Sequence, residues 1–338
     1  MKPDWYSKLP DENQEFCKEN LELFYATMRE RMLIWKRRFI DCLPQPWTDN
    51  EILRDFKFTN VYRELDRNSQ WQIKNILLDD TLNNVDLVWK LMVFRIFNNP
   101  ETFQFFIETR GWRNGIPSWR QFNSDEFLEA VRTYRATGNN PFTNAYLVNS
   151  GRENSNRDVW YCKRHLPELH EKLPLIMRLM KTADNPKELI KFLTTLPSVA
   201  NFIAHEYYQD MTYIAIYTDR NLMRFTQNDY TNVGPGASMG LRLTLPNLKR
   251  REQESGIYKL RDMAGEWLKK IDEREGTLTP FVKWDKTDRR YVIIDECNLT
   301  LHQIEMWLCE FQKYWKMIIQ EGKQRSKFQL RTKELIVK

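Results

Sequence analysis

The hydrophobic positions of this 338-residue chain recur mostly three and four residues apart, which is the period of a helix with one buried face. This spacing predicts a long helix that begins at a cap on Asp11 and ends before Pro44. Residues 281–284 and 291–294 alternate instead, around a polar turn that suits a hairpin. We therefore expect an all-α fold with at most a small β-hairpin. Shorter helices are predicted over residues 86–97, 126–135, 166–181 and 256–273.

Two further helices are joined by a tight turn. The first begins at Asn185-Pro186, because proline suits the first turn of a helix, and the second continues through Tyr207. This arrangement resembles the helix-hairpin-helix of DNA glycosylases, whose hairpin N–H groups hold a DNA phosphate. Ser198 and Ala200 stand where that hairpin usually has glycines. The candidate DNA-binding residues are Pro197, Ser198, Val199 and Ala200.

The stretch over residues 228–241 combines a carboxylate, a Gly-Pro-Gly turn and the start of a helix. Gly234 and Gly236 are expected to take backbone angles closed to other residues, with the helix running from Ala237 onward. A turn that leads into a helix leaves N–H groups free to bind an anion such as phosphate. Asp229 lies just before this turn. An ordinary loop with an acidic cap explains the stretch equally well.

Polar residues also recur three and four positions apart between residues 58 and 71. Arg63, Asp66 and Arg67 share this spacing with Gln70, so one helix face would carry all four. Such a face is either a network of ion pairs or the wall of an anion site, because arginine forks onto phosphate oxygens. Composition alone slightly favours the ion pairs.

A capping box at Thr300-Leu-His-Gln303 opens the last predicted helix, which is expected to run to Gly322. Glu310 and Lys313 lie on this helix among apolar residues. An ion pair on the helix surface explains these two residues as well as a binding site does.

Composition narrows the function classes. The 52 basic and 46 acidic residues leave a net charge of +6, which permits nucleic-acid binding without demonstrating it. Five cysteines without a Cys-x-x-Cys pair fit a reduced cytoplasmic compartment. The four histidines lack metal-ligand spacing, so no metal is expected. The sequence predicts neither a signal peptide nor a membrane-spanning run.

Six blocks of the sequence occur in the order seen in one family. On these blocks the chain resembles the α-glutamyl/putrescinyl thymine pyrophosphorylase family, which shares its helical domain with phage 5-hydroxymethyluracil DNA kinases. The resemblance covers most of the chain, from about Phe58 to Tyr314. The blocks are Phe58-Thr-Asn-Val-Tyr-Arg-Glu-Leu-Asp-Arg67, Val93-Phe-Arg-Ile-Phe-Asn98, Leu196-Pro-Ser-Val199, Asp210-Met-Thr-Tyr213, Val233-Gly-Pro-Gly-Ala237 and Leu308-Cys-Glu-Phe-Gln-Lys-Tyr314.

The resemblance implies a DNA-glycosylase-like fold and a role in hypermodifying phage thymines, in the cytoplasm of an infected bacterium. In that scheme a kinase pyrophosphorylates 5-hydroxymethyluracil within DNA, and a transferase replaces the pyrophosphate with an amino acid or polyamine. The 338 residues contain no Gly-x-x-x-x-Gly-Lys-Ser/Thr motif, which favours the transferase. The implied partners are the modified DNA, the amine and the kinase, without a cofactor.

The chemistry of this transfer assigns roles to residues. Pyrophosphate leaves with charge that arginines or helix N-termini can stabilise, and the attacking amine must be neutral, which suits a carboxylate base. We expect Arg63 and Arg67 to hold the anion, Asp66 to orient Arg63, and Asp229 or Asp210 to be the base. The candidate substrate-binding residues are Asn60, Tyr62, Gln70, Glu206, Gly234, Gly236, Ala237, Glu310 and Lys313.

Two other functions stay open from the sequence: a DNA N-glycosylase that expels a damaged base, and a non-catalytic DNA-binding module. In each case we expect a single unit of two helical lobes around a basic cleft. One lobe is predicted to comprise residues 1–75 and 206–322, and the other residues 76–205, followed by a basic tail over 323–338.

Overall fold

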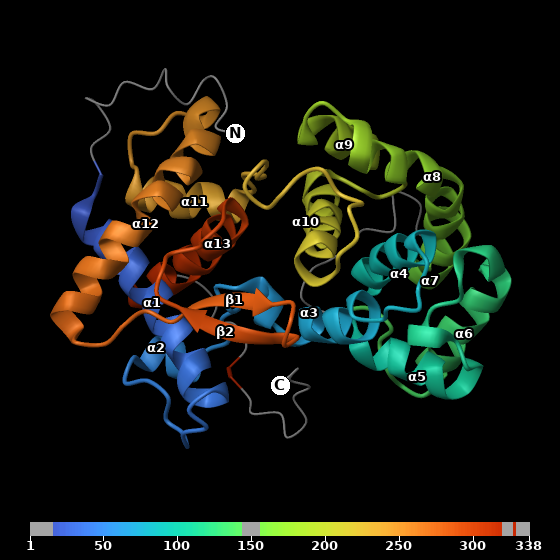
Figure 1. Cartoon of the computed structure of the whole chain (residues 1–338), viewed down its shortest axis with the longest axis horizontal. Helices are drawn as coiled ribbons and strands as arrows, with labels where there is room; N and C mark the ends of the chain where they lie inside the picture. Colours follow the sequence, from blue (N-terminus) through green and yellow to red (C-terminus); the bar gives the residue numbers. More distant parts are fainter. Residues whose placement is uncertain (1–15, 144–155, 320–326, 329–338) are drawn as a thin grey trace. The chain divides into compact units, whose positions relative to one another are not determined.

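The computed structural model describes residues 16–143, 156–319 and 327–328, and helices dominate it. Within these residues the one sheet is an antiparallel hairpin of β1 (Phe281–Asp285) and β2 (Arg290–Ile294) (Figure 1). Phe281 pairs with Ile294 and Asp285 with Arg290 across the two strands. The predicted all-α fold with a small hairpin is confirmed.

The observed helices follow the hydrophobic spacing closely. The cap predicted at Asp11 and the helix end predicted at Gly322 lie outside the described residues. No helix in the described part of the chain combines the length and the apolar character that crossing a membrane requires. The longer helices are α1 (Lys18–Phe39), α4 (Asn84–Phe97), α5 (Pro100–Arg110), α6 (Ser124–Ala136), α8 (Leu166–Thr182), α10 (Asn201–Tyr217), α11 (Pro235–Thr244), α12 (Gln253–Glu275) and α13 (Leu301–Ile318). The shorter ones are α2 (Glu51–Asp55), α3 (Arg67–Gln72), α7 (Arg157–Trp160) and α9 (Pro186–Leu193).

Single turns of tighter or wider helix connect these elements. The 3₁₀ turns are η2 (Arg63–Leu65), η4 (Arg113–Gly115), η5 (Trp119–Gln121) and η7 (Arg250–Glu252). The π-helical turns are η3 (Ile73–Leu77) and η6 (Tyr161–His165).

The described chain folds into two compact units. Unit 1 contains residues 16–66 and 227–319 with 327–328, and unit 2 contains residues 67–143 and 156–226. The unit boundaries therefore fall after Asp66 and after Thr226. The sequence analysis expected the lobe boundaries near residues 75 and 205. The predicted arrangement of two lobes around a basic cleft stays a prediction.

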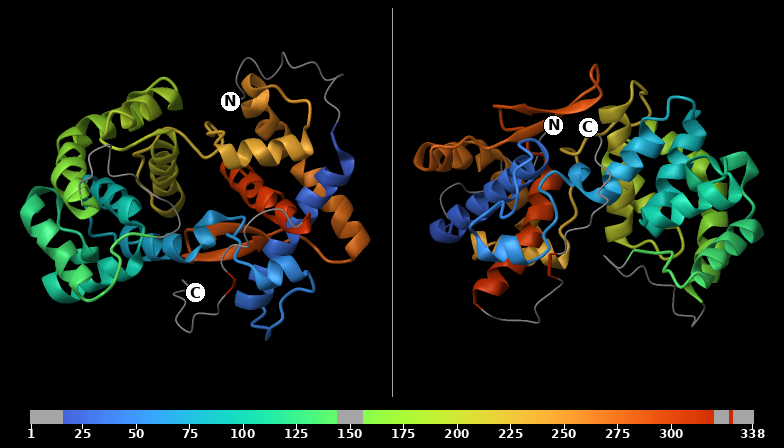
Figure 2. Two further views of the ribbon diagram at one scale, coloured as in Figure 1. Left: turned by 180° about the vertical axis from the view of Figure 1, so that it is seen from behind. Right: turned by 90° about the horizontal axis from the view of Figure 1, so that it is seen from below.

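Unit 1 is built around α13, against which α1, α11 and α12 pack (Figures 1 and 2). Ile304, Leu308 and Phe311 lie three to four residues apart on α13 and are fully buried. The ring of Phe311 meets Phe24 of α1 edge to face, with centroids 5.3 Å apart. Each such side chain contributes about 1.5–3 kcal/mol on burial, so this one face of α13 is a large part of the core.

Glycines allow α11 to lie close to α13. A Cβ on Gly240 would stand 2.4 Å from the carbonyl oxygen of Leu308, and a Cβ on Gly236 would stand 3.0 Å from Cys309 Sγ. The two glycines are four residues apart and therefore share the face of α11 that meets α13. Neither Gly234, at φ −73°, nor Gly236 has a left-handed backbone, and the helix begins at Pro235. The prediction of unusual glycine angles and of a helix starting at Ala237 is wrong; close packing explains the second glycine.

Unit 2 has an aromatic core that surrounds α4. Trp71 stacks on Phe94 of α4 with ring centroids 4.9 Å apart, and Trp112 stacks on Phe127 at 5.5 Å. Helix α4 is buried along nearly its whole length, between α8 and α10. Arg95 lies in this apolar helix with 7% of its surface exposed, so its charge requires partners within the core.

The hairpin between α9 and α10 is anchored from within unit 2. The imidazole of His165 lies 2.8 Å from Pro197 O through Nδ1 and 3.0 Å from the Tyr207 hydroxyl through Nε2. Burial lowers the pKa of His165 to about 4, so the ring is neutral at pH 7, with Nδ1–H donating to Pro197 and Nε2 accepting from Tyr207. Ser198 has a left-handed backbone at φ 60°, and its Oγ accepts a hydrogen bond of 2.9 Å from Trp160 Nε1.

Ser198→Gly is expected to change the free energy of unfolding by less than about 0.5 kcal/mol, because two effects nearly cancel. Glycine removes roughly 1 kcal/mol of left-handed strain but also removes a hydrogen bond of about 1 kcal/mol to Trp160. Ser198→Val loses this bond of about 1 kcal/mol and adds the strain of a β-branched side chain at positive φ, so it should destabilise by about 2 kcal/mol. Urea unfolding of both variants checks this, and a strongly stabilised glycine variant would contradict it.

Candidate functional site

The first turn of α13 gathers two segments that are distant in the sequence. The Tyr62 hydroxyl donates to Asn298 Oδ1 at 2.6 Å, just before the helix. Asn228 Oδ1 accepts a hydrogen bond of 3.2 Å from the backbone N–H of Leu301. Thr300 and Gln303 form the predicted capping box. Residues 58–66 and 227–230 therefore meet at this turn, and all of these residues belong to unit 1.

The segment 58–66 is a folded loop ending in a 3₁₀ turn, and the prediction of one continuous helix face through Asp66 is wrong. Asp66 Oδ1 accepts hydrogen bonds from the backbone N–H of Asn60 at 2.9 Å and from its side-chain amide at 3.1 Å. The same amide also donates to the Leu65 carbonyl at 2.9 Å. These bonds hold Asp66 extended, at φ −72° and ψ 147°, which stops the helix.

Arg63 and Asp66 nevertheless form an ion pair, with Arg63 Nη1 2.6 Å from Asp66 Oδ2. About one fifth of each side chain is exposed. Arg67 and Gln70 lie beyond the extended residue, on α3 of unit 2. Arg67 pairs with Glu101 there, and Gln70 is buried. The four residues therefore do not share a helix face, and the Arg63–Asp66 pair is the part of the predicted constellation at the α13 turn.

Glu64 is a titratable residue at this turn that the sequence analysis did not select. Its Oε2 is buried, and its carboxylate accepts a hydrogen bond from the Gln303 side chain. Burial raises the pKa of Glu64 to about 7, although the hydrogen bonds from its own backbone N–H and from Gln303 each lower this pKa. Spacing could not reveal this residue, because Gln303 is far away in the sequence.

Asp229 is half-buried beside Asn228 and precedes α11 by a few residues. Its charge acts on Tyr258 of α12. The pKa of Tyr258 is raised to about 12, mainly by burial and next by the charge of Glu254, and the charge of Asp229 adds a smaller increase. The N-cap residue of α11 is Gly234, which has no side chain to accept a hydrogen bond. The N–H groups of the first turn, including that of Ala237, therefore lack a side-chain cap. The carboxylate and the helix start that the sequence singled out thus lie in unit 1 with the α13 turn.

Asp210 has a different environment from Asp229. It is almost fully buried in unit 2, where Arg95 Nε donates to its Oδ2 at 2.6 Å and Arg95 Nη2 to its Oδ1. Arg95 Nη1 also donates to Glu206 Oε2 at 2.9 Å. Burial raises the pKa of Asp210, and the paired guanidinium of Arg95 opposes that rise. Both carboxylate oxygens are engaged, which suits a structural ion pair better than a proton acceptor.

Glu310 and Lys313 are paired on α13. Lys313 Nζ donates to Glu310 Oε1 at 2.5 Å, and the other oxygen of Glu310 lies 3.4 Å from the backbone nitrogen of Thr59. The ion pair considered from the sequence is therefore present, but Glu310 is only 3% exposed, so its carboxylate is buried and does not lie on the helix surface. The pair also connects α13 to the loop that carries Arg63.

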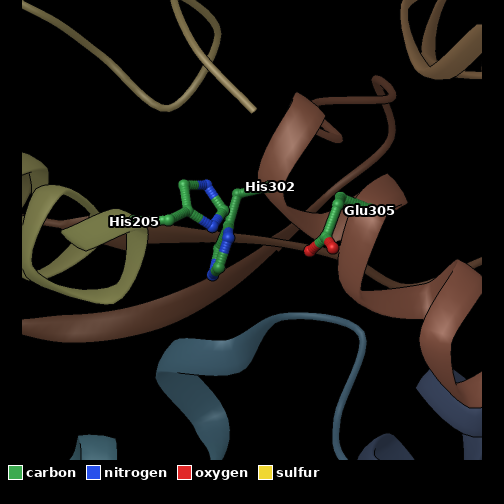
Figure 3. Close-up of side chains that lie close together, drawn as sticks. All are labelled: His205, His302 and Glu305. Carbon is green, nitrogen blue, oxygen red and sulfur yellow. The ribbon is translucent and has the colours of Figure 1, made fainter. Parts of the chain in front are cut away.

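Three buried polar side chains are drawn in Figure 3: His205 on α10 of unit 2, and His302 and Glu305 on α13 of unit 1. Burial lowers the pKa of His205 to about 3, and Gln209 Nε2 lies 2.9 Å from its Nε2. His302 and Glu305 are three residues apart and so share a face of α13. The sequence analysis selected none of the three, and the expectation of no bound metal stays a prediction.

The hairpin proposed to bind DNA offers fewer free N–H groups than its sequence suggests. The Val199 N–H donates to the Leu196 carbonyl at 3.1 Å. Ala200 is the N-cap of α10 and supplies no side-chain cap, so the first turn of α10 presents its N–H groups without one. Any phosphate contact of the hairpin would therefore use the start of α10, with Pro197 and Ser198 shaping the turn.

Comparison with known proteins gives one family and one relative. The family model described as the helical domain of 5-hmdU DNA kinase matches residues 18–324. The 5-hmdU DNA kinase of Bacillus phage SP10 is 25% identical over 341 aligned residues, which cover 93% of this chain and 49% of the relative. The chain thus spans about half the length of the curated relative that it matches. No solved structure matches the chain.

Proposed function

The chain belongs to the family of the helical domain of 5-hmdU DNA kinase, and on this premise we propose that it acts on hydroxymethylated uracil in phage DNA. Its reaction would replace the pyrophosphate of 5-pyrophosphoryloxymethyluracil with an amino acid or polyamine. The family match over most of the chain supports a role in modifying hydroxymethyluracil in DNA. The transfer reaction is supported by the resemblance to the thymine pyrophosphorylase family, which shares its helical domain with these kinases.

The geometry of unit 1 supports transfer chemistry. Arg63 presents a cation that Asp66 holds at 2.6 Å, and the uncapped start of α11 lies in the same unit. Both features suit a departing pyrophosphate, because fixed donors stabilise charge that develops as the bond breaks. Asp229 is half-buried, and its neighbour Asn228 bonds to the first turn of α13. This position suits a carboxylate that accepts a proton from the attacking amine.

The DNA would be engaged by the start of α10, and the target base would leave the duplex to reach the reacting groups. Flipping a base costs a few kcal/mol, which phosphate contacts along the strand can offset. The net charge of +6 is compatible with these contacts.

A direct assay tests the proposal. The full chain is incubated with duplex DNA carrying 5-pyrophosphoryloxymethyluracil, together with glutamate, glycine, serine or putrescine in separate reactions. Mass spectrometry of the released nucleosides should detect an amine adduct in at least one reaction, with stoichiometric pyrophosphate. No adduct with any of these amines, or abasic sites in their place, would refute the transferase.

Arg63→Ala should lower kcat/KM of the transfer by about 10²-fold, as loss of a charge-stabilising donor does elsewhere. Arg54→Ala is the matched control, because Arg54 lies on α2 of the same unit and pairs with Asp55 at the surface. The control should retain full activity. If Arg63→Ala keeps its activity but melts much earlier than the wild type, Arg63 is structural.

A second candidate function has one specific observation in its favour. The SP10 relative is a kinase by name, and this chain matches only half of it. The chain could then be the half that presents hydroxymethyluracil to a phosphorylating domain. Phosphoryl transfer from ATP to hydroxymethylated DNA only after a separate kinase domain is added, without an amine adduct in the assay above, would select this function.

A further inference from the structure

Hydrogen bonds connect Glu64 to the first turn of α13. Gln303 Oε1 accepts from the Thr300 backbone N–H at 2.6 Å and from the Thr300 hydroxyl at 2.7 Å. The amide nitrogen of Gln303 is then the atom available to donate to Glu64. The capping box therefore both starts the helix and orients a donor toward the Glu64 carboxyl.

Thr300 extends this arrangement to Gln227. The Thr300 hydroxyl lies 3.1 Å from the Gln227 side-chain amide, but its one proton is already donated to Gln303. Gln227 must therefore turn its NH₂ toward Thr300 and its oxygen outward, because the network decides an amide's orientation. This outer amide atom has no hydrogen-bond partner among the described residues, although only 4% of Gln227 is exposed. A buried amide end of this kind can take a hydrogen bond from a bound water or from a ligand.

We propose that Glu64 is the general acid of the transfer and gives its proton to the departing pyrophosphate, with Gln227 contacting the substrate beside it. This inference rests on the proposed function. Glu64 directly follows Arg63, the cation assigned to the pyrophosphate. The charge of Arg63 acts on the Glu64 carboxyl and lowers its pKa, so the donor and the cation are close enough to serve the same anion.

The electrostatics of the turn agree with that role. Burial is the main cause that raises the pKa of Glu64 to about 7, so about half of the carboxyl is protonated at neutral pH. Asp66 raises this pKa further and Arg63 lowers it, while α13 contributes the neutral Gln303. The next titratable residues on that helix are His302 and Glu305.

Two carboxyls in different surroundings thus divide the proton chemistry. One carboxylate oxygen of Glu64 is buried and this residue keeps a proton to give, whereas Asp229 suits the acceptor. The amine nitrogen bonds to the exocyclic methylene carbon and loses one proton to Asp229. The carbon–oxygen bond breaks, its electron pair stays on the pyrophosphate oxygen, and that oxygen takes the proton of Glu64.

Leaving-group dependence tests this assignment. The full chain and its Glu64→Gln variant are assayed with two DNA substrates, one bearing pyrophosphate and one bearing methylenebisphosphonate, whose departing oxygen is more basic. Glu64→Gln should lower transfer about 10²-fold with pyrophosphate and by more with the bisphosphonate, because a poorer leaving group depends more on an acid. Equal losses with both substrates would overturn the proposal and leave Glu64 a structural role.

The pH dependence gives an independent result. Wild-type kcat/KM should fall as the pH rises through about 7, and this fall should be absent in Glu64→Gln. Asp66→Asn keeps an acceptor for Asn60 but removes a charge that raises the pKa of Glu64, so the fall should move to lower pH. An unchanged profile in Glu64→Gln would contradict the general acid.

Folding of the variant is checked by the same pH series. A carboxyl with a raised pKa adds stability that is present below about 4.5 and lost as the pH rises through about 7. The melting temperature of Glu64→Gln should therefore fall less than that of the wild type between pH 5 and pH 8. If wild-type chain forms no adduct, the proposed function fails, whereas full activity of Glu64→Gln refutes only the general acid.

Discussion

Replacing Arg95 by leucine is expected to lower the free energy of unfolding by about 3–5 kcal/mol, the usual cost of breaking a buried ion pair. Arg95 is 7% exposed on α4 and donates to both oxygens of Asp210 and to Glu206. Leucine keeps much of the apolar contact but leaves two carboxylates buried without their cation. The loss is therefore electrostatic, and not a loss of packing volume.

Urea unfolding at pH 7 measures this loss, and a surface pair is the matched control. Arg110 of unit 2 pairs with Glu129 at 3.0 Å, but 68% of the Glu129 side chain is exposed. Arg110→Leu should change stability by less than about 1 kcal/mol. The triple variant Arg95→Leu, Glu206→Leu, Asp210→Leu should recover much of the loss. A loss below 1 kcal/mol in Arg95→Leu alone would show that the pair does not hold α4 to α10.

Gly240→Ala is expected to destabilise the chain by about 3 kcal/mol, as overpacking of a close contact does. The added Cβ would lie 2.4 Å from the Leu308 carbonyl oxygen, which is backbone and cannot rotate away. Helix α11 must then move off α13 along the face that both helices bury. The better helix propensity of alanine returns only about 1 kcal/mol, so the packing cost before that gain is about 4 kcal/mol, above the usual range because the backbone cannot move aside.

Gly234→Ala is the control for this substitution. It lies at the start of the same helix with nothing within 4 Å of an added Cβ, at an ordinary φ of −73°. Its free energy of unfolding should stay within about 0.5 kcal/mol of the wild type. Equal stability of the two alanine variants in thermal and urea unfolding would show that the helices can separate freely.

The sequence predicted the elements whose signals are local. Helix α13 begins at the Thr300 capping box because Thr300 and Gln303 complete each other's hydrogen bonds within one turn. Helix α9 begins after Asn185, whose side chain accepts from the backbone N–H of Glu188. Such signals involve residues three or four positions apart, which a linear pattern displays directly.

Predictions from the sequence were wrong where tertiary contacts or side-chain hydrogen bonds to the backbone decide the local structure. The spacing of Arg63, Asp66 and Arg67 imitates a helix face, but Asp66 accepts two hydrogen bonds from Asn60 and becomes extended. Gly236 was interpreted as a turn signal because its packing partner, Cys309, lies far along the chain. The spacing of residues along the sequence does not reveal such contacts, so a pattern of spacing alone predicts the wrong local structure there.

The candidate site was predictable only in part for the same reason. Arg63 was selected for its helical spacing and Asp229 for its place before a turn, whereas Arg95 and Asp210 are 115 residues apart and meet only after folding. Glu64 and Gln303 belong to different segments of unit 1, and a protonated carboxyl has no signature in composition. Buried polar groups are defined by their three-dimensional neighbours.

The interrupted course of unit 1 along the chain has a consequence for biosynthesis. Its first segment ends at Asp66 and its second begins at Gln227, so all of unit 2 is translated between them. Tyr25 of α1 bonds to the Leu260 carbonyl, 235 residues later. At about 5–20 residues per second, the ribosome takes roughly 10–50 s to add that many residues. During this interval the apolar face of α1 has emerged without α12 and α13, so it stays uncovered until those helices are released.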